Sequence, residues 1–438
     1  MTPAFVTEKF TIGVVGLSHL GIVTSVCLAS LGFRIIGVDT DERTIGELQS
    51  GACNIPEPTL SALLGKNIKS ITFTTDFSKI SECAVVLVTK DTPTNERNEM
   101  EPAAVNALGD AAIPYLADNV EIALMSQVPV GFTRAFERRI SGHRPDLLFS
   151  LAYWVDTLVI GDAVARFLKP ERIILGFGNA SASPGTHVLS LLSCFTCPVL
   201  TMRFESAELT KAAINIYLAT SVTFANIIAN ICEATGADIG EVAHGLRLDK
   251  RIGQYAYIKP GLGLSGGHLE RDVVMLARIA QEQHIKTKFF DVIREESTLR
   301  HKWLYDKLEM EVFARVAFPT IAIWGLSYKK NTDSTFCAPS INLIKNFEKR
   351  ATFVAYDSIA QLPEGVKVHR VNEKYRAVEG ADCLLILNNC DEFADIDFER
   401  LQKSMAHPLI IDCLGALFEV KQLPAGIRYM AMGRQTMT

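Results

Sequence analysis

A glycine-rich turn near the start of the chain has the residue types that bind a dinucleotide. Gly16, Ser18 and Gly21 stand at the glycine positions of a Gly-x-Gly-x-x-Gly turn, with serine in the middle, and Leu20 lies between them. Small residues there let backbone N–H groups approach a pyrophosphate at a helix N-terminus. Asp39 follows roughly 20 residues later, the spacing of the acid that binds a ribose diol. A carboxylate also repels a 2′-phosphate, so these residues predict NAD as the cofactor and favour it over NADP.

The elements that must hold this turn are a strand before it, a helix after it and a second strand that ends at the acid. Residues 10–15 form a short apolar run, which is typical of a buried parallel strand. A helix is predicted over residues 22–31, with Gly32 as its C-terminal cap. A second strand over residues 34–38 leads into Asp39. This order is that of a Rossmann unit and favours a cofactor site over a purely structural turn.

The same alternation continues along the chain. Further strands are predicted over residues 84–89, 121–126, 173–176, 320–326, 352–356, 383–387 and 408–412. Apolar residues at three- and four-residue spacing predict one long helix over residues 207–234. The predicted fold class is therefore α/β, with two Rossmann-like doubly wound domains joined by a central helical region with a long helix. Residues from about 425 onward are expected to be loosely held.

We expect three domains in a chain of 438 residues, because one hydrophobic core rarely grows to this size. Residues 1–205 are predicted to form the NAD-binding Rossmann domain. Residues 206–300 are predicted to form the central helical domain with the active-site loop. Residues 301–438 are predicted to form a C-terminal Rossmann-like domain that binds the nucleotide of the substrate.

A second glycine-rich stretch runs from Gly261 to Asp272 and reads Gly-Leu-Gly-Leu-Ser-Gly-Gly-His-Leu-Glu-Arg-Asp. It resembles the active-site loop of the nucleotide-sugar 6-dehydrogenases, the UDP-glucose/GDP-mannose dehydrogenase family. That loop carries a nucleophilic cysteine where this chain has His268. The cysteine lets the family oxidise a sugar alcohol through an aldehyde to a carboxylate, with two hydride transfers. Without a thiol at this position, the thioester route of the family is not available.

Other motifs resemble the family in order and spacing over nearly the whole chain. They are Thr92-Pro93, Ser126-Gln127-Val128-Pro129-Val130-Gly131, Pro170-Glu171-Arg172, Glu208-Leu209-Thr210-Lys211 with Asn215, Gly236-Ala237-Asp238, residues 249–253 and residues 325–333. The resemblance implies that the cofactor is bound by Gly16, Ser18, Leu20, Gly21, Asp39, Thr92, Pro93, Gln127 and Arg271. It implies that the substrate is bound by Arg251, Gly263 and Lys329.

The catalytic residues implied by the resemblance include Lys211, Asn215 and Asp272, which keep the family's residue types. In the family, the matching lysine and aspartate hold a water near the reacting carbon and manage its proton. A lysine and an aspartate brought together by the fold can stabilise an alkoxide and relay a proton. We therefore expect Lys211 and Asp272 to form the chemical core, the alternative being a structural salt bridge between them.

The departures from the family cluster in the reactive region. Its first active-site glutamate becomes Asp156, which with His268 completes the set of predicted catalytic residues, and the second becomes Ile160. Two arginines of its C-terminal domain become Phe336 and Leu414, which predicts a less charged substrate pocket. His268 has three interpretations. It could act as a general base, because its unperturbed pKa lies near neutrality, orient a sugar hydroxyl, or fill the space of the thiol.

The missing thiol limits the predicted product. One hydride step converts a primary alcohol into an aldehyde or a secondary alcohol into a ketone, and a ketone at C6 requires a sugar longer than a hexose. We predict an NAD-dependent nucleotide-sugar dehydrogenase that performs a single two-electron oxidation, for example 6-keto formation on a nucleotide heptose or octose. In kind, the resemblance extends to nucleotide-octose dehydrogenases. The alternatives are a redox-neutral epimerase, a four-electron 6-dehydrogenase that makes a uronic acid, and a non-catalytic nucleotide-sugar binder.

Composition and charge argue against several other classes of protein. The net charge of −5 and the lack of a Lys/Arg tract give no sign of a nucleic-acid partner. No uninterrupted apolar run reaches about 18 residues, so no membrane span is predicted. Residues 1–10 lack a signal-peptide pattern, which predicts a cytoplasmic protein. The ten cysteines lack zinc-ligand spacing, so no metal site is predicted.

The long helix bears on the oligomeric state. The resemblance implies a homodimer with this helix at the interface. Its apolar stripe consists of Leu218, Val222, Ala225, Ile228 and Ile231. The same stripe could equally be an internal core seam, so the predicted dimer rests on the resemblance.

Overall fold

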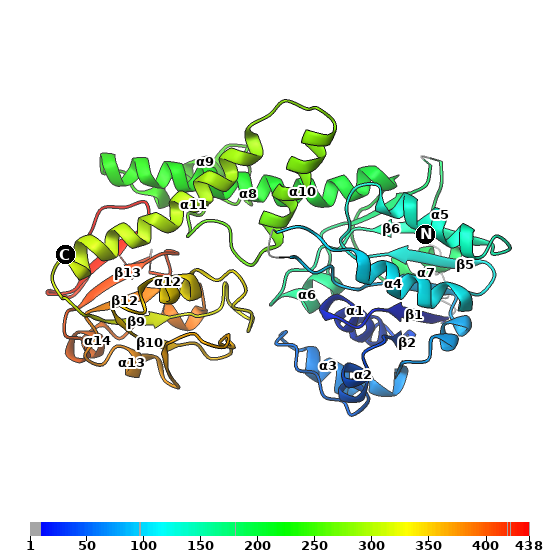
Figure 1. The fold of residues 1–438 in the computed structure, drawn as a ribbon, viewed down its shortest axis with the longest axis horizontal. Helices are drawn as coiled ribbons and strands as arrows, with labels where there is room; N and C mark the ends of the chain where they lie inside the picture. Colours follow the sequence, from blue (N-terminus) through cyan, green and yellow to red (C-terminus); the bar gives the residue numbers. More distant parts are fainter. Residues whose placement is uncertain (1–9, 96–97, 180, 418, 421, 438) are drawn as a thin grey trace. The chain divides into compact units, whose positions relative to one another are not determined.

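The computed structural model describes residues 10–95, 98–179, 181–417, 419–420 and 422–437 (Figure 1). The chain divides into two compact units, Met1–Ala213 and Ile214–Thr438. Both contain a Rossmann-like sheet, and the long helix α8 (Phe204–Thr235) begins in the first unit and continues into the second. The predicted fold class is confirmed, whereas the division into three domains stays a prediction.

The first unit is built on an eight-stranded sheet with the order β3-β2-β1-β4-β5-β6-β7-β8. Its strands are β1 (Thr11–Val15), β2 (Arg34–Val38), β3 (Ile71–Thr74), β4 (Val85–Val88), β5 (Val120–Leu124), β6 (Phe149–Trp154), β7 (Ile173–Phe177) and β8 (Val199–Arg203). All neighbouring strands are parallel except β6 and β7, which pair antiparallel. The carboxyl ends of β1, β2, β4 and β5 therefore meet at one edge of the sheet, where α/β proteins bind ligands.

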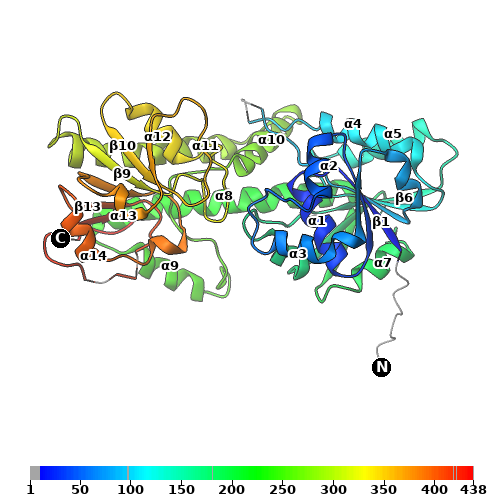
Figure 2. The same ribbon diagram turned by 90° about the horizontal axis from the view of Figure 1, so that it is seen from below.

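Helices cover both faces of this sheet. They are α1 (His19–Ser30), α2 (Glu42–Gln49), α3 (Leu60–Asn67), α4 (Ala103–Ala112), α5 (Phe132–His143), α6 (Ala163–Leu168) and α7 (Thr186–Leu192). One buried cluster joins the sheet to α1, α3, α6 and α7, and a second joins the opposite face to α4 and α5 (Figure 2). α1 begins three residues before its predicted start, and residues 20–29 are all buried. Burial on all sides explains why its sequence is largely apolar.

The second unit has a six-stranded parallel sheet with the order β11-β10-β9-β12-β13-β14. Its strands are β9 (Thr320–Trp324), β10 (Thr352–Tyr356), β11 (His369–Val371), β12 (Cys383–Ile386), β13 (Leu409–Asp412) and β14 (Arg428–Ala431). Its helices are α9 (Ile239–Leu248), α10 (His268–Glu282), α11 (Phe289–Leu308), α12 (Pro339–Phe347), α13 (Lys374–Ala377) and α14 (Phe398–Ser404), together with most of α8.

The expectation of a loosely held C-terminus is wrong. β14 pairs with β13, and Tyr429 is fully buried with its hydroxyl donating a hydrogen bond of 2.8 Å to Asp412 Oδ2. Met430 and Met432 belong to the hydrophobic core on one face of the sheet. The segment is ordered because its apolar side chains complete the core at the edge of the sheet.

α8 is long and apolar enough to cross a membrane, judged by length and composition alone. Polar side chains spaced along it nevertheless bond within the protein. Asn226 Oδ1 accepts a hydrogen bond of 2.9 Å from Gly261 N, and Asn230 Oδ1 accepts one from the Arg300 guanidinium. Asn226 is buried and Asn230 is exposed, and both bonds attach α8 to other segments of its own unit.

The two sheets use the same turn at the same place. Gly16 and Leu17 follow β1, and Leu17 N donates to Asp39 Oδ2 over 2.7 Å. Gly325 and Leu326 follow β9, and Leu326 N donates to Asp357 Oδ2 over 2.8 Å. In both units the carboxylate after the second strand thus fixes the turn after the first strand.

Candidate active site and dinucleotide site

The first glycine of the turn after β1 is required by its surroundings. Gly16 has a φ of 99°, a conformation that side chains other than hydrogen rarely allow. A Cβ atom at this position would also lie 2.8 Å from the backbone nitrogen of Lys90. At Gly21, a Cβ atom would lie 1.8 Å from the carbonyl oxygen of Gly16. This close approach of turn and helix forms a cradle that fits a dinucleotide pyrophosphate.

Asp39 lies at the carboxyl end of β2, as predicted, and is buried. Its Oδ2 accepts hydrogen bonds from Leu17 N at 2.7 Å and from Lys90 Nζ at 3.1 Å. Its Oδ1 accepts a hydrogen bond from Asp41 N at 3.2 Å. The acid therefore holds the turn in place and carries an ion pair with Lys90.

A second carboxylate lies at the N-terminus of α1. Ser18 is the N-cap residue, and its hydroxyl oxygen accepts a hydrogen bond of 2.7 Å from Asp91 N. Asp91 Oδ2 in turn accepts a bond of 3.4 Å from Leu20 N, one of the first N–H groups of the helix. The sequence analysis missed both Lys90 and Asp91. Their position directly after β4, which pairs with β1, is the signal that could have identified them.

The predicted cofactor residues after β4 and β5 lie together. The Thr92 hydroxyl donates a hydrogen bond of 2.5 Å to the carbonyl oxygen of Gln127. Pro93 follows in the same loop and is exposed. The contact fixes two loops at the edge of the sheet that carries Gly16 and Asp39.

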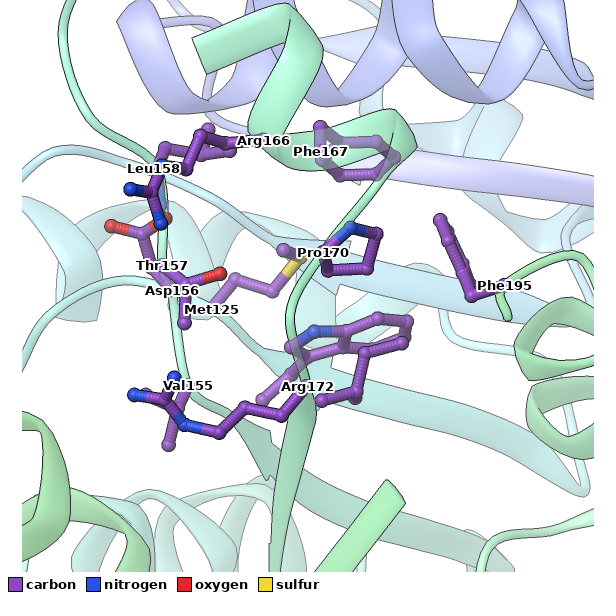
Figure 3. Close-up of a pocket in the computed structure, with 12 residues that line it drawn as sticks. Met125, Val155, Asp156, Thr157, Leu158, Arg166, Phe167, Pro170, Arg172 and Phe195 are labelled. Atoms are coloured by element: carbon purple, nitrogen blue, oxygen red, sulfur yellow. Dashed lines mark hydrogen bonds between the residues drawn. The ribbon is translucent and has the colours of Figure 1, made fainter. Parts of the chain in front are cut away.

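Lys211 is anchored to the segment after β6. Its ammonium donates to the carbonyl oxygen of Asp156 at 2.6 Å and lies 3.5 Å from Asp156 Oδ2. Asp156 lines a small pocket, with Arg166 and Arg172 on its side and the apolar residues Phe167, Pro170 and Phe195 opposite (Figure 3). The structure thus brings together two of the predicted catalytic residues, Lys211 and Asp156.

Glu57 is a buried acid that the sequence analysis missed. Its carboxylate accepts hydrogen bonds from Gly161 N at 2.5 Å and Ala163 N at 3.0 Å, and contacts His19 Nε2 at 2.8 Å. Burial acts to raise the pKa of Glu57, but these hydrogen bonds outweigh it and the pKa is lowered. Glu57 thereby ties the first residue of α1 to the loop that follows Asp156.

In the second unit, Asn215 and Asp272 form a pair. Asn215 Nδ2 donates a hydrogen bond of 2.5 Å to Asp272 Oδ2, and the Asp272 side chain is fully buried. Arg271 is also buried, and its Nε lies 3.7 Å from Asp272 Oδ1. Lys211 and Asn215 are one turn apart on α8. Because Lys211 and Asp272 belong to different units, their proximity stays a prediction.

The glycine-rich loop is hydrogen-bonded to α11. Leu264 N donates a hydrogen bond of 2.8 Å to Ser297 Oγ. Gly263 has a φ of 81°, and a Cβ atom there would lie 2.6 Å from the carbonyl oxygen of Ser297. The loop ends at Gly267, and His268 is the first residue of α10 and is exposed. No sequence signal pointed to Ser297, because it lies in the middle of an ordinary helix.

The predicted substrate residues Arg251 and Lys329 lie in different loops of the second unit. Arg251 is exposed, and its Nη2 lies 2.6 Å from Asp249 Oδ2. Lys329 is half-buried in the loop after β9, with its ammonium 5.4 Å from the centre of the Tyr328 ring. Their role in substrate binding stays a prediction.

Cys337 lies close to the glycine-rich loop. Its neighbour Phe336 packs against Gly267, where a Cβ atom would lie 2.6 Å from the ring. Burial, and secondarily the carboxylate of Glu270, raise the pKa of Cys337. Because the thiolate is the nucleophile, this thiol is poorly suited to replace the one missing at His268.

Three parts of one family model match the chain in succession. The NAD binding domain of the UDP-glucose/GDP-mannose dehydrogenase family matches residues 10–191. The central domain matches residues 205–297, and the UDP binding domain matches residues 322–419. These matches cover most of the chain.

Individual relatives are similar over most of their length. UDP-glucose 6-dehydrogenase TuaD of Bacillus subtilis is 31% identical over 434 residues, which cover 97% of this chain and 93% of the relative. UDP-glucose 6-dehydrogenase of Pseudomonas aeruginosa is 29% identical over 441 residues, which cover 96% of this chain and 97% of the relative.

Solved structures have the same fold. A UDP-glucose dehydrogenase from Pyrobaculum islandicum matches with a TM-score of 0.87 and 23% identity, over 99% of this chain and 100% of that chain. A UDP-D-ManNAc dehydrogenase from Pyrococcus horikoshii matches with a TM-score of 0.83 and 20% identity, over 97% and 99% respectively.

Proposed function

The chain belongs to the UDP-glucose/GDP-mannose dehydrogenase family, and on that premise we propose that it performs a single two-electron oxidation of a nucleotide sugar. It is an NAD-dependent oxidoreductase that acts on a CH–OH group of a nucleotide sugar. The product we propose is a carbonyl compound, and the carbon oxidised is C6 of a sugar longer than a hexose. A nucleotide heptose or octose would then give a stable 6-ketone.

One observation carries this proposal. His268, the first residue of α10, stands where the sequence resemblance places the family's nucleophilic cysteine, and its side chain is exposed rather than packed away. An imidazole cannot form the thioester that a second oxidation requires. The neighbouring Cys337 is disfavoured as a substitute, because burial and secondarily Glu270 raise the pKa of its thiol and the thiolate is the nucleophile.

The first oxidation needs no thiol. NAD, when bound, supplies the hydride acceptor. The turn at Gly16, the N-terminus of α1 and Asp39 are the groups of this chain that would hold it. We propose that the Lys211 ammonium, anchored on the Asp156 carbonyl oxygen, stabilises the substrate alkoxide. Asp272, held by Asn215, accepts the hydroxyl proton.

The test is the product formed with a panel of nucleotide hexoses, heptoses and octoses, read by mass spectrometry together with NADH stoichiometry. We expect loss of two hydrogen atoms and one NADH per sugar. A carboxylate formed with two NADH per sugar by the wild-type protein would overturn the proposal. A redox-neutral epimerase would instead change the sugar without net NADH, and a non-catalytic binder would leave it unchanged.

Two variants sharpen this experiment. His268→Cys restores a thiol at the family position, and some carboxylate product is expected if the rest of the site is competent for the second step. Cys337→Ser removes the nearby thiol, and an unchanged product is expected. If the wild-type protein makes a carboxylate and Cys337→Ser abolishes it, Cys337 is the nucleophile and the single-oxidation proposal is wrong.

We also propose that the protein is a homodimer with α8 at the interface. Tyr217, Phe224 and Ile231 recur at seven-residue spacing on α8 and are 69%, 45% and 52% exposed. Val222 and Ala225 of the predicted stripe are instead buried in the core. An exposed apolar stripe on a long helix is typical of a helix–helix interface. Light scattering of the wild-type protein and of Phe224→Glu tests this, and a monomeric wild-type protein would contradict it.

The remaining proposals concern location and partners. All ten cysteines are free thiols, which favours a reducing compartment, and we propose the cytoplasm. The net charge of −5 favours neither a nucleic acid nor an anionic membrane surface as a partner. The partner we propose is the nucleotide sugar itself.

A further inference from the structure

The predicted binding site for the adenosine ribose contains an ion pair rather than a lone carboxylate. A lone carboxylate at the end of the second strand binds the ribose diol of NAD and repels the 2′-phosphate of NADP. Here Asp39 Oδ2 lies 3.1 Å from the ammonium of Lys90. The pair carries no net charge, so the repulsion that would exclude a 2′-phosphate is largely cancelled.

The strand order and the backbone fix the position of Lys90 beside Asp39. It follows β4, which pairs in parallel with β1, and β1 pairs with β2 on its other side. A Cβ atom at Gly16 would lie 2.8 Å from Lys90 N, so the turn and the lysine backbone are in direct contact. The lysine therefore projects from the same edge of the sheet as the pyrophosphate cradle.

The ammonium remains accessible to a ligand. The Lys90 side chain is 27% exposed, whereas the Asp39 side chain is 2% exposed. An ammonium has three N–H donors, and the bond to Asp39 uses one of them. A phosphate oxygen next to the ribose could accept from another donor without breaking the ion pair.

Further charges of both signs follow Asp39 along the chain. Asp41 follows Asp39, and hydrogen bonds from Thr44, with a smaller contribution from the Lys90 charge, lower the pKa of Asp41. Arg43 at the start of α2 is exposed, with its Nε 3.1 Å from Glu47 Oε1. A cationic side chain near this position is a feature of sites that accept a 2′-phosphate.

We propose that Lys90 is a specificity-determining residue of the dinucleotide site and that it lets this chain bind NADP as well as NAD. The sequence analysis favoured NAD over NADP because it treated Asp39 as an unpaired carboxylate. This inference rests on dinucleotide binding by the family and not on the proposed single oxidation, so product analysis does not bear on it.

Direct binding measurements test the proposal without any turnover. Isothermal titration calorimetry with NAD and with NADP is performed on the wild-type protein and on Lys90→Met, Lys90→Arg and Lys66→Met. Methionine keeps the length of the stem and removes the charge. Lys66 is an exposed lysine near the end of α3 and serves as the control.

The expected result is an NADP dissociation constant within about tenfold of that for NAD in the wild-type protein. Lys90→Met should weaken NADP binding by about tenfold or more and change NAD binding by less than about threefold. Lys90→Arg should retain NADP binding, and Lys66→Met should change neither constant. NADP binding in the wild-type protein weaker than this range overturns the proposal. A parallel loss of both dinucleotides in Lys90→Met also overturns it, because the lysine would then only support the fold of the site.

Discussion

The side-chain amide of Asn215 donates a hydrogen bond of 2.5 Å to the carboxylate of Asp272, which is completely buried. Asn215 lies one helical turn after Lys211 on α8, and Asp272 lies in the first turns of α10. A single helix therefore carries both the proposed alkoxide-stabilising cation and the group that orients the proposed proton acceptor. Catalytic groups must be held in a narrow range of positions, and a helix is a rigid element that can do this.

Replacing Lys211 by methionine should remove catalysis while keeping the cofactor site. We expect kcat to fall by roughly 10²- to 10⁴-fold, the usual contribution of a positioned acid–base or electrostatic group. NAD affinity should be unchanged, because Lys211 bonds the segment at Asp156 and not the turn at Gly16. Steady-state kinetics and calorimetry, with Lys66→Met as control, check this. A variant that retains more than about a tenth of kcat would rule out the proposed role.

Replacing Asn215 by alanine should destabilise the protein as well as lower kcat. The buried Asp272 carboxylate would lose a donor, which costs about 1–3 kcal/mol of the free energy of unfolding. Urea denaturation of Asn215→Ala and of the exposed control Gln254→Ala measures this cost. Equal midpoints for the two variants would show that the Asn215–Asp272 bond does not stabilise the fold.

Replacing Glu57 by glutamine should give a stability loss that depends on pH. The pKa of Glu57 is lowered in the folded protein, so its ionised form stabilises the fold above the unfolded pKa of about 4.3. This stabilisation is lost as pH falls through the folded pKa. We expect a loss of about 1–3 kcal/mol in the free energy of unfolding at neutral pH, which shrinks as the pH falls below about 4. Urea midpoints over this pH range test the sign, and a difference that grows on acidification would contradict it.

Replacing Ser297 by alanine should loosen the glycine-rich loop. Leu264 N would lose its acceptor, a change worth about 1 kcal/mol, and amide exchange over residues 261–267 should accelerate. We expect kcat to fall several-fold with little change in NAD affinity, because the bond that is lost supports the glycine-rich loop and not the turn at Gly16. Thr298→Ala, which removes only a hydroxyl bonded within α11, is the matched control. Unchanged exchange in Ser297→Ala would exclude this positioning role.

Replacing Asp91 by asparagine should tighten NAD binding. The Asp91 carboxylate lies at the N-terminus of α1, 3.4 Å from Leu20 N, where a pyrophosphate also seeks N–H groups. Removing its negative charge should raise NAD affinity by about two- to fivefold, the size of one charge interaction with a helix end. Calorimetry measures this effect, and weaker binding by Asp91→Asn would show that the carboxylate instead supports the site.

Several features of this protein were already determined by local sequence. The turn from Gly16 to Gly21, the acid at Asp39 and the long helix α8 follow from residue types and spacings over short stretches of chain. Strand and helix periodicities act over a few residues, so they can be read without knowing the fold. The substitution of His268 for the family's cysteine is likewise visible in the sequence alone.

Only the tertiary structure decided which distant groups meet. Lys90 and Asp39 are separated by 51 residues and Ser297 and Leu264 by 33, and no local pattern relates them. Glu57 bonds to Gly161 across 104 residues. The edge strand β14 also escaped the sequence analysis, which expected this segment to be loosely held. Contacts of this kind depend on strand order and on packing between elements. Strand order decides which charge lies beside Asp39, and packing between elements decides how the glycine-rich loop is supported.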